Sequence, residues 1–409
     1  MARKTHDEIS EIMKREGVDR IFSWSKWDTF FTSPYEYFLK YIKKVPEDRQ
    51  DCIYPVTGGL AHDILEKFYK GDITYEEMLS CFEDGWMTSY DIAQLKFDRN
   101  DEQRNESIGE KYYADLHHFF KNHKKLPYKV MLEQFAKIKV GNDLFQGYID
   151  VCFKDDDGYY QIIDWKTSSI YKGTTALEKC GQLVLYAMGL MQQGIPRDKI
   201  KIGWNFLKYV KVQQPMKKKD ENGNYIIKER TIERFEIGDK LKTNAKMWLK
   251  ECGYSNDEIE QYLEDLVIQN SIDALPDDVK SKYVINDCYE YVDLTDELLA
   301  NWVTTIANVI SQIDFCEKAY AATGDEKVWW DTEESVQKES YYFATLSGYS
   351  PNLHLPYKAY LEKLEAQANG TDMFGGVGTA ADDNDTPPFD MDTNESSTVD
   401  DDLSWLETL

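Results

Sequence analysis

The stretch that decides the fold runs from residue 146 to residue 169 and reads QGYIDVCFKDDDGYYQIIDWKTSS. Two apolar segments flank the turn-forming DDDG, a pattern that predicts two antiparallel strands joined by a hairpin. Asp150 lies in the first strand, and Asp164 and Lys166 lie at the end of the second. Because alternate residues of a strand point the same way, Asp164 and Lys166 share one face while Trp165 points to the other. Pairing of the two strands is expected to bring Asp150 close to Asp164.

Two interpretations of these charges are open. Asp164 and Lys166 can form a structural ion pair at a strand end, since short charged triplets are common. Alternatively, Asp150 and Asp164 hold a cation, because two close carboxylates repel each other unless a positive charge lies between them. A hard ion such as Mg²⁺ or Mn²⁺ takes oxygen ligands, and Lys166 would stabilise the charge that develops on a phosphate. The second interpretation predicts phosphodiester hydrolysis.

The hydrophobic pattern divides the chain into four regions. Residues 1–125 are predicted to be helical, and residues 126–236 to form strands, a helix, a strand and a long hairpin with Asn222-Gly223 at its tip. Residues 237–365 are predicted to be mainly helical, and residues 366–409 to be a disordered acidic tail. The expected fold class is α/β, with a mixed central sheet flanked by helices and with helical extensions at both ends.

Composition excludes several classes of protein. The chain has 409 residues and a net charge of −26, of which the tail from residue 366 contributes 11 Asp/Glu and no Lys/Arg. Such a balance argues against a broad nucleic-acid-binding surface but not against a local basic groove. There is no apolar run of membrane-spanning length, no signal-peptide core and no glycine-rich nucleotide-binding motif. We therefore expect a cytoplasmic protein, in a bacterial cell or a phage-infected host, that binds neither membrane nor nucleotide.

Further residues accompany the hairpin in a recognisable order: Glu133, Gly147, Asp150, Asp164-Trp165-Lys166, Gln182 and Tyr186. This order resembles the PD-(D/E)XK nuclease superfamily, and most of all its RecB-like exonuclease branch, which includes CRISPR-associated and phage recombination exonucleases. That branch shows G-x-x-D, a hairpin, I-I-D-x-K-T and a helix with Q-x-x-x-Y. The resemblance implies a restriction-endonuclease-like core.

The resemblance also implies roles for single residues. Asp150 and Asp164 would be catalytic metal ligands, the backbone carbonyl of Trp165 a further ligand, and Lys166 the catalytic lysine. Gln182 and Tyr186 are four residues apart and so share a helix face, which in the family lines the substrate side and supports the catalytic residues. Ordinary surface polarity for Gln182 and a core ring for Tyr186 are the alternative.

Two acid–base residues outside the hairpin remain open. Glu133 matches an acidic position that assists metal binding in the family, or else it has a scaffolding role. His62 lies in GGLAHDILE, which resembles a family segment whose histidine completes the metal site from a helix. Imidazole is a reasonable ligand for Mn²⁺. A buried core histidine is the alternative for His62, because apolar residues flank it.

Some members of this branch carry an iron–sulfur cluster, and this chain is expected to lack one. The first cluster cysteine of those relatives corresponds to Ser33, before Pro34, and the segment QKESYYFATLSGY at 337–349 has no cysteine. The seven cysteines show no C-x-x-C spacing, so reduced thiols are expected. Packing of Trp and Tyr would then join the C-terminal part to the N-terminal helices.

The predicted function is that of a divalent-metal-dependent DNA exonuclease acting in recombination, repair or phage DNA processing. A structure-selective endonuclease of the same fold and a non-catalytic scaffold acting through its tail are the alternatives. Lysine clusters, with Trp204 or Tyr209 for base stacking, either form a DNA track or are solvated faces; they are Lys40, Lys43 and Lys44; Lys121, Lys124 and Lys125; and Lys217, Lys218 and Lys219. The tail could bind a single-stranded-DNA-binding or other replication or recombination protein, cover the enzyme's own groove, or have no partner.

Overall fold

The computed structural model describes residues 4–350, 362 and 365–366, and these divide into two compact units. The first unit comprises the chain up to Trp24 together with Gln50–Asn308. The second comprises Ser25–Arg49 and the described residues from Val309 onward. The predicted disordered tail lies outside the described residues from residue 367 onward, and the predicted division into four domains stays a prediction.

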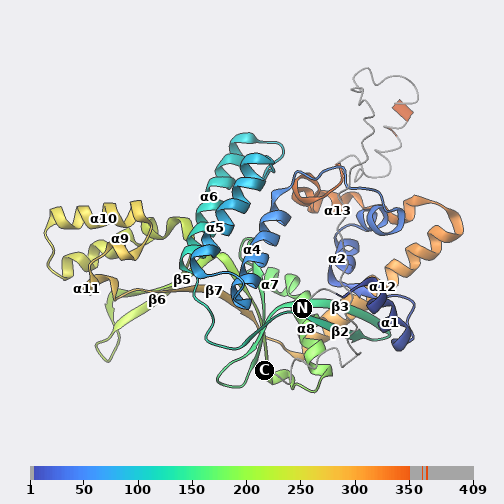
Figure 1. Cartoon of the computed structure of the whole chain (residues 1–409), viewed down its shortest axis with the longest axis horizontal. Coiled ribbons are helices and arrows are strands. Elements are labelled where there is room, and N and C mark those ends of the chain that lie inside the picture. Colours follow the sequence, from blue (N-terminus) through green and yellow to red (C-terminus); the bar gives the residue numbers. More distant parts are fainter. Residues whose placement is uncertain (1–3, 351–361, 363–364, 367–409) are drawn as a thin grey trace. The chain divides into compact units, whose positions relative to one another are not determined.

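A mixed sheet forms the centre of the first unit (Figure 1). The described residues supply seven strands: β1 (Phe22–Ser23), β2 (Val130–Val140), β3 (Asp143–Lys154), β4 (Tyr160–Lys166), β5 (Ile200–Lys219), β6 (Tyr225–Glu233) and β7 (Val284–Val292). The order β1-β3-β4-β5-β6 is extended by β2, which pairs with β3, and by β7, which pairs with β5. Parallel pairs (β1–β3 and β4–β5) alternate with antiparallel ones, so the predicted mixed α/β fold is confirmed.

Strand β3 changes its neighbour along one edge. Its C-terminal residues 151–154 pair with β4, whereas residues 145–146 pair with β1. Residues 147–150 lie between these two ladders, and on the other edge of the strand residues 147–149 pair with β2. The sheet therefore opens beside Asp150, and this opening positions the site described below.

Helices cover the sheet on both faces (Figure 1). The helices of the first unit, with the short helical turns that accompany them, are α1 (His6–Glu16), α4 (Ile53–Lys70), α5 (Tyr75–Trp86), η2 (Met87–Ile92), α6 (Glu102–Asn122), α7 (Thr174–Lys179), α8 (Gly181–Gln192), η3 (Arg197–Lys199), η4 (Arg234–Glu236), α9 (Ile237–Glu251), α10 (Asn256–Gln269), η5 (Ile272–Ala274) and α11 (Asp277–Lys280). Helices α4, α5 and α6 share one apolar core with the Ile163 and Trp165 side chains of β4. The one helix expected within residues 126–236 is divided into α7 and α8 at Cys180.

An arm extends from the sheet at the far ends of β5 and β6 (Figure 1). Here β6 and β7 flank β5, and α9, α10 and α11 pack on these strands around a second apolar core that includes Val212 and Leu241. The turn between β5 and β6 contains Asn222 and Gly223, as the sequence predicted. Strand β7 lies in a region expected to be mainly helical, and of its nine residues only Cys288 and Val292 are buried.

The second unit joins two segments that are far apart in sequence. It contains most of α2 (Trp24–Thr32), then α3 (Pro34–Tyr37) and η1 (Phe38–Lys43), the C-terminal half of α12 (Asp296–Thr323), and η6 (Glu326–Trp329), α13 (Glu333–Lys338) and η7 (Tyr342–Leu346). Trp329 is fully buried and its ring contacts those of Tyr37 and Phe38. Aromatic packing of the predicted kind is thus present within this unit.

Polar contacts reinforce this packing, and no sequence pattern predicted them. Ser33 Oγ donates to Asp331 Oδ2 at 3.0 Å. Glu36 Oε2 accepts hydrogen bonds from Tyr342 Oη at 2.7 Å and from Ser347 Oγ at 3.0 Å. Because Ser33, Glu36 and Ser347 are buried, each of these bonds is shielded from water and contributes to joining the two segments.

Among the described residues, no helix has both the length and the apolar character needed to cross a membrane.

Candidate active site

Glu133 and Asp150 lie opposite each other on neighbouring strands. The antiparallel register pairs Gln134 of β2 with Ile149 of β3, so the preceding residue, Glu133, lies opposite Asp150. Opposite residues of an antiparallel pair share a face of the sheet. Glu133 has a φ of 48°, in the left-handed region that non-glycine residues rarely adopt. A backbone of this kind in mid-strand is strained, and such strain is often found at functional sites.

The same row continues to Asp164. The β3–β4 ladder pairs Val151 with Ile163, and the next residues along the two strands are Asp150 and Asp164. The hairpin therefore brings the two carboxylates together as the sequence predicted, at the point where the ladder ends. Asp164 is buried, with 5% of its surface exposed.

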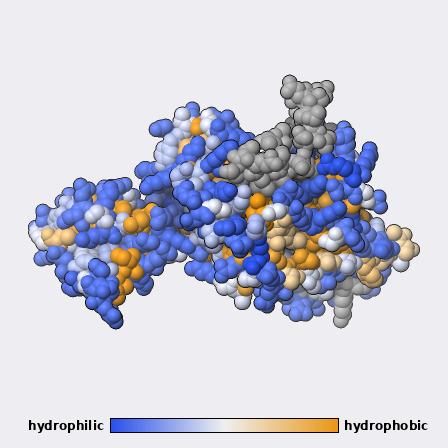
Figure 2. Space-filling view, turned by 90° about the horizontal axis from the view of Figure 1, so that it is seen from below, coloured by the Kyte–Doolittle hydropathy of each residue, from blue (hydrophilic) through white to orange (hydrophobic). Residues whose placement is uncertain are grey.

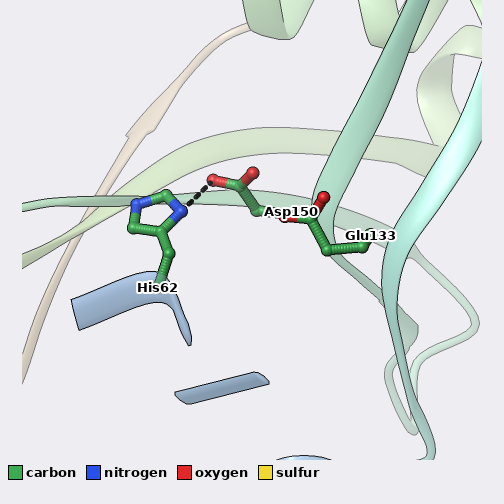
Figure 3. Close-up of side chains that lie close together, drawn as sticks. All are labelled: His62, Glu133 and Asp150. Carbon is green, nitrogen blue, oxygen red and sulfur yellow. Dashed lines mark ion pairs between the residues drawn. The ribbon is translucent and has the colours of Figure 1, made fainter. Parts of the chain in front are cut away.

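Helix α4 brings His62 to this row. Nδ1 of His62 lies 3.5 Å from Oδ2 of Asp150, and Figure 3 shows the imidazole directed at that carboxylate. Nε2 of His62 donates to the backbone carbonyl of Trp165 at 2.8 Å. His62, Glu133 and Asp150 each offer one ligand atom, and these atoms lie within 4.8 Å of one another. His62 is thus half-buried at the site, in contact with two residues of the motif, rather than enclosed in the apolar core.

Lys166 lies beside Asp164 on the same strand. Its Nζ is 2.7 Å from Asp164 Oδ2. Burial alone would lower the pKa of Lys166, but the neighbouring Asp164 and Asp150 outweigh burial and raise that pKa above its usual value. Lys166 is therefore a fixed positive charge at the end of β4.

The position of Asp150 disfavours a second negative charge beside Asp164. Burial raises the pKa of Asp150 well above its usual value, and the nearby Asp164 raises it further, while Lys166 acts in the opposite direction. Oδ2 of Asp150 is buried and accepts no hydrogen bond from the described residues. Buried acceptors of this kind normally have a partner, so the atom calls for a cation or an ordered water.

The donor set fits a divalent cation. It combines carboxylate oxygens, a backbone carbonyl and one imidazole, which suit Mg²⁺ or Mn²⁺. Because Nε2 of His62 donates its proton to the Trp165 carbonyl, Nδ1, which lies 3.5 Å from Asp150 Oδ2, is the ring nitrogen that would coordinate the ion. His62, Glu133, Asp150, Asp164 and the Trp165 carbonyl are the groups that would hold the ion.

Tyr186 and Gln182 approach the row from α8. Gln182 Nε2 donates to Tyr186 Oη at 3.2 Å, across one helical turn. Tyr186 is buried against Gly147, where a Cβ would lie 2.7 Å from the tyrosine ring. Burial raises the pKa of Tyr186, as do the charges of Asp150 and its neighbours, so the hydroxyl stays protonated as a donor. The ring therefore supports the strand that carries Asp150.

Two supporting tyrosines were not found by sequence reasoning. Tyr112 of α6 donates its hydroxyl to the carbonyl of Thr167 at 2.6 Å, directly after the D-W-K triplet. The ring of Tyr69 in α4 packs on that of Trp165 with centroids 6.0 Å apart. Both lie far from the motif in sequence, and no spacing within the chain links them to it.

Several residues expected to form a DNA track are buried or form ion pairs within the chain. Trp204 is only 2% exposed, so its ring is a core side chain and the expectation that it stacks on bases is wrong. Lys40 pairs with Glu47, Lys43 with Glu326 and Lys217 with Glu251. These three lysines are therefore already neutralised by carboxylates of the chain.

Comparison with known proteins identifies the family. The model of the PD-(D/E)XK nuclease superfamily matches residues 21–312, which include the row of carboxylates, His62, Lys166 and the arm. No curated protein matches the chain. The match covers more than half of the 409 residues.

Proposed function

The chain belongs to the PD-(D/E)XK nuclease superfamily, whose members are metal-dependent nucleases, and from this premise we propose that it is an exonuclease acting on DNA ends. The observation that carries the proposal is the convergence of His62, Asp150, Asp164 and Lys166, from one helix and two strands, around one small volume. Recombination, repair or phage DNA processing is the proposed context.

The acidic residues of the site are proposed to hold the cation. Asp150, Asp164 and the Trp165 carbonyl would hold the ion, with His62 and Glu133 completing the set. Mg²⁺ or Mn²⁺, when bound, supplies Lewis-acid activation of a water and neutralises phosphate charge. The strained backbone of Glu133 fixes its carboxylate opposite Asp150 before any substrate arrives.

Lys166 supplies the positive charge that the reaction needs. Its ammonium is kept protonated by Asp164 and Asp150, so it donates hydrogen bonds to a phosphate oxygen that gains charge in the transition state. Gln182 and Tyr186 of α8 position β3 through the contact of Tyr186 with Gly147. We expect the substrate to bind on the face of the sheet that carries Asp150, Asp164 and Lys166.

An exonuclease of the RecB-like branch is favoured over an endonuclease because a helix N-terminal to the core contributes His62, the arrangement that this branch shares. The cytoplasmic location and a protein partner for the acidic tail stay predictions. No step proposed here requires a nucleotide, and translocation driven by one would need another protein.

End-labelled linear DNA, single- and double-stranded, beside closed circles is the decisive substrate set. Release of label in Mg²⁺ or Mn²⁺ without nicking of circles is the expected result, and the labelled end gives the polarity. Lys166→Ala and Asp164→Ala variants should lose this activity. Nicking of circles would instead assign the structure-selective endonuclease, and equal cleavage by all three proteins would point to a contaminating nuclease and to a non-catalytic scaffold.

A further inference from the structure

The arm is charged unevenly along its sequence. Residues 211–250, which include the outer part of β5, all of β6 and α9 except its last residue, Glu251, contain 11 Lys/Arg and 6 Asp/Glu. Residues 251–283, which include α10 and α11, contain 2 Lys/Arg and 9 Asp/Glu. Figure 2 shows that the visible face of this lobe is mainly hydrophilic. In a chain with 74 acidic and 48 basic residues, the first segment is an exception that asks for a reason.

Three lysines of α9 lie in a row. Lys242, Lys246 and Lys250 are spaced by four residues, so they follow one another along the same side of the helix, and all three are exposed. None of their side chains forms an ion pair or hydrogen bond with another described residue. We call these three residues the α9 lysine row.

Other lysines of the arm behave differently. Lys217 pairs with Glu251, Lys240 with Glu236, and Lys280 with Asp273. Paired and unpaired lysines therefore coexist on one lobe, and within α9 the three lysines of the row differ from Lys240, which has a carboxylate partner.

The row cannot turn away from solvent. The opposite side of α9 is buried in the arm core through Leu241, Ala245 and Leu249. Asn244 Nδ2 and Trp248 Nε1 both donate to the carbonyl of Pro215 at 3.1 Å, which fixes the helix on β5. Like charges at four-residue spacing destabilise a helix. A row of this kind is therefore held outward at an electrostatic cost that a bound polyanion would offset.

We propose that the α9 lysine row binds the phosphate backbone of double-stranded DNA at a distance from the point of cleavage. This inference rests on the proposed nuclease function. Successive lysines of the row are about 6 Å apart along the helix axis, so each can reach a separate phosphate of one strand. Such contacts carry no sequence information and act by neutralising charge.

The arm also sets the distance of this contact from the site. Strand β5 connects the site to the row. Trp204 of β5 lies beside Asp164 in the parallel β4–β5 ladder. Lys217, near the outer end of β5, forms an ion pair with Glu251, the residue after Lys250. The thirteen residues from Trp204 to Lys217 span roughly 43 Å at the rise of an extended strand. That length corresponds to about 13 base pairs at 3.4 Å each. The row would therefore contact duplex well away from the end being cut.

The test compares DNA binding by the full chain with that of a Lys242→Ala, Lys246→Ala, Lys250→Ala variant, both measured by fluorescence anisotropy without divalent metal. On a duplex of about 30 base pairs the row variant should bind at least tenfold more weakly at low salt, and the slope of log K against log salt should fall by about 2.7 for three lost contacts. On a duplex of about 8 base pairs, too short to reach the arm, the two proteins should bind alike.

The matched control is Lys217→Ala, Lys240→Ala, Lys280→Ala, which removes the same charge from lysines of the arm that are already paired. It should keep most of the affinity and salt slope of the wild type. An equal loss in the control would overturn the proposal, because the effect would then follow net charge. Unchanged or tighter binding by the row variant, the result expected if the row held the acidic tail, would overturn it as well.

This test separates the arm from the active site. If the wild type cuts DNA and the row variant binds the long duplex as tightly as the wild type does, the proposal for the α9 lysine row fails and the proposed nuclease function stands. If the wild type neither binds nor cuts DNA in any metal, the proposed function fails first. If the row variant cleaves the short duplex at the rate of the wild type, its active site is intact.

Discussion

Gly147 and Tyr186 are in direct contact across the opening in the sheet. A Cβ built at residue 147 would lie 2.7 Å from a ring carbon and 2.9 Å from the hydroxyl of Tyr186. The absence of a side chain at this position is therefore what lets the ring lie beneath the strand that carries Asp150, three residues further on.

Gly147→Ala is accordingly expected to displace Tyr186 and with it the end of β3. Overpacking of this kind costs about 1–3 kcal/mol of unfolding free energy, and nuclease activity should fall by more than the loss of stability explains. Denaturant unfolding and cleavage rates measure the two effects. Gly59→Ala is the control, since a Cβ there meets nothing within 4 Å; a loss in that variant equal to the one in Gly147→Ala would contradict the steric explanation.

Asp150→Asn should raise the thermal stability of the metal-free protein while abolishing cleavage. Burial and the neighbouring Asp164 raise the pKa of Asp150, so ionising this carboxyl costs stability as pH rises, and the neutral amide removes that cost without changing the shape of the side chain. We expect an increase in Tm on the order of a few degrees in EDTA. Mg²⁺ should then raise the Tm of the wild type but not that of the variant. A lower Tm for Asp150→Asn in EDTA would show that the carboxylate is not held at a cost.

His62→Ala should weaken metal binding more than it weakens folding. The imidazole contacts Asp150 and the Trp165 carbonyl, and loss of such a group typically reduces metal affinity about 10–100-fold. Activity should therefore need more Mn²⁺ and recover partly at high concentration, in a titration of rate against metal. His117→Ala is the control, because that residue lies on α6 and contacts Glu83. An unchanged metal requirement in His62→Ala would restrict His62 to a structural role.

Asp115 predicts a pH dependence of stability that is independent of the metal site. Burial raises the pKa of this carboxyl to about 7, against a hydrogen bond from the backbone N–H of Phe235. Among its neighbours, Lys208 and Arg234 lower the pKa and Glu233 raises it. Since the folded-state pKa exceeds the unfolded one, the folded state binds more protons between about pH 4 and 7, and this group's contribution to stability falls as pH rises through that range.

The test of this dependence is the difference between wild type and Asp115→Asn at several pH values. Asparagine can still accept the Phe235 hydrogen bond but does not ionise. The variant should therefore gain stability relative to the wild type as pH rises from 5 to 8, by up to ~2.6 kcal/mol, with little further gain above about pH 8. Urea unfolding gives the comparison. A constant difference across the range would show that Asp115 does not titrate there.

Local patterns were enough to predict most of what positions the site. Alternation around the DDDG turn predicted the β3–β4 hairpin, and with it the closeness of Asp150 to Asp164, because register follows from the turn. Four-residue spacing likewise predicted that Gln182 and Tyr186 would meet. These features depend on short-range geometry that a sequence carries explicitly.

The features that were missed all depend on tertiary packing. The left-handed backbone of Glu133, the burial of Trp204 and the support of Thr167 by Tyr112 arise from contacts between distant elements. Strand β7 is stabilised by pairing with β5 from eighty residues away rather than by its own alternation. Propensity within a segment cannot register a partner of this kind.

Lys166→Met should have the opposite effect on stability to Asp150→Asn. Methionine keeps the apolar stem but leaves Asp164 and Asp150 without the ammonium that compensates them, so the metal-free protein should lose on the order of 1–3 kcal/mol. Cleavage should fall by about a hundredfold or more, because the charge that stabilises the transition state is absent. Mg²⁺ should stabilise this variant more than it stabilises the wild type, since the ion then provides the only positive charge between the carboxylates. Lys201→Met is the control. Lys201 forms an ion pair with Asp155 and is more exposed than Lys166, so its loss should change stability by less than about 1 kcal/mol. If Lys166→Met were as stable as the wild type in EDTA, the two carboxylates would not depend on Lys166, and the account of a shared charge balance at the site would be wrong.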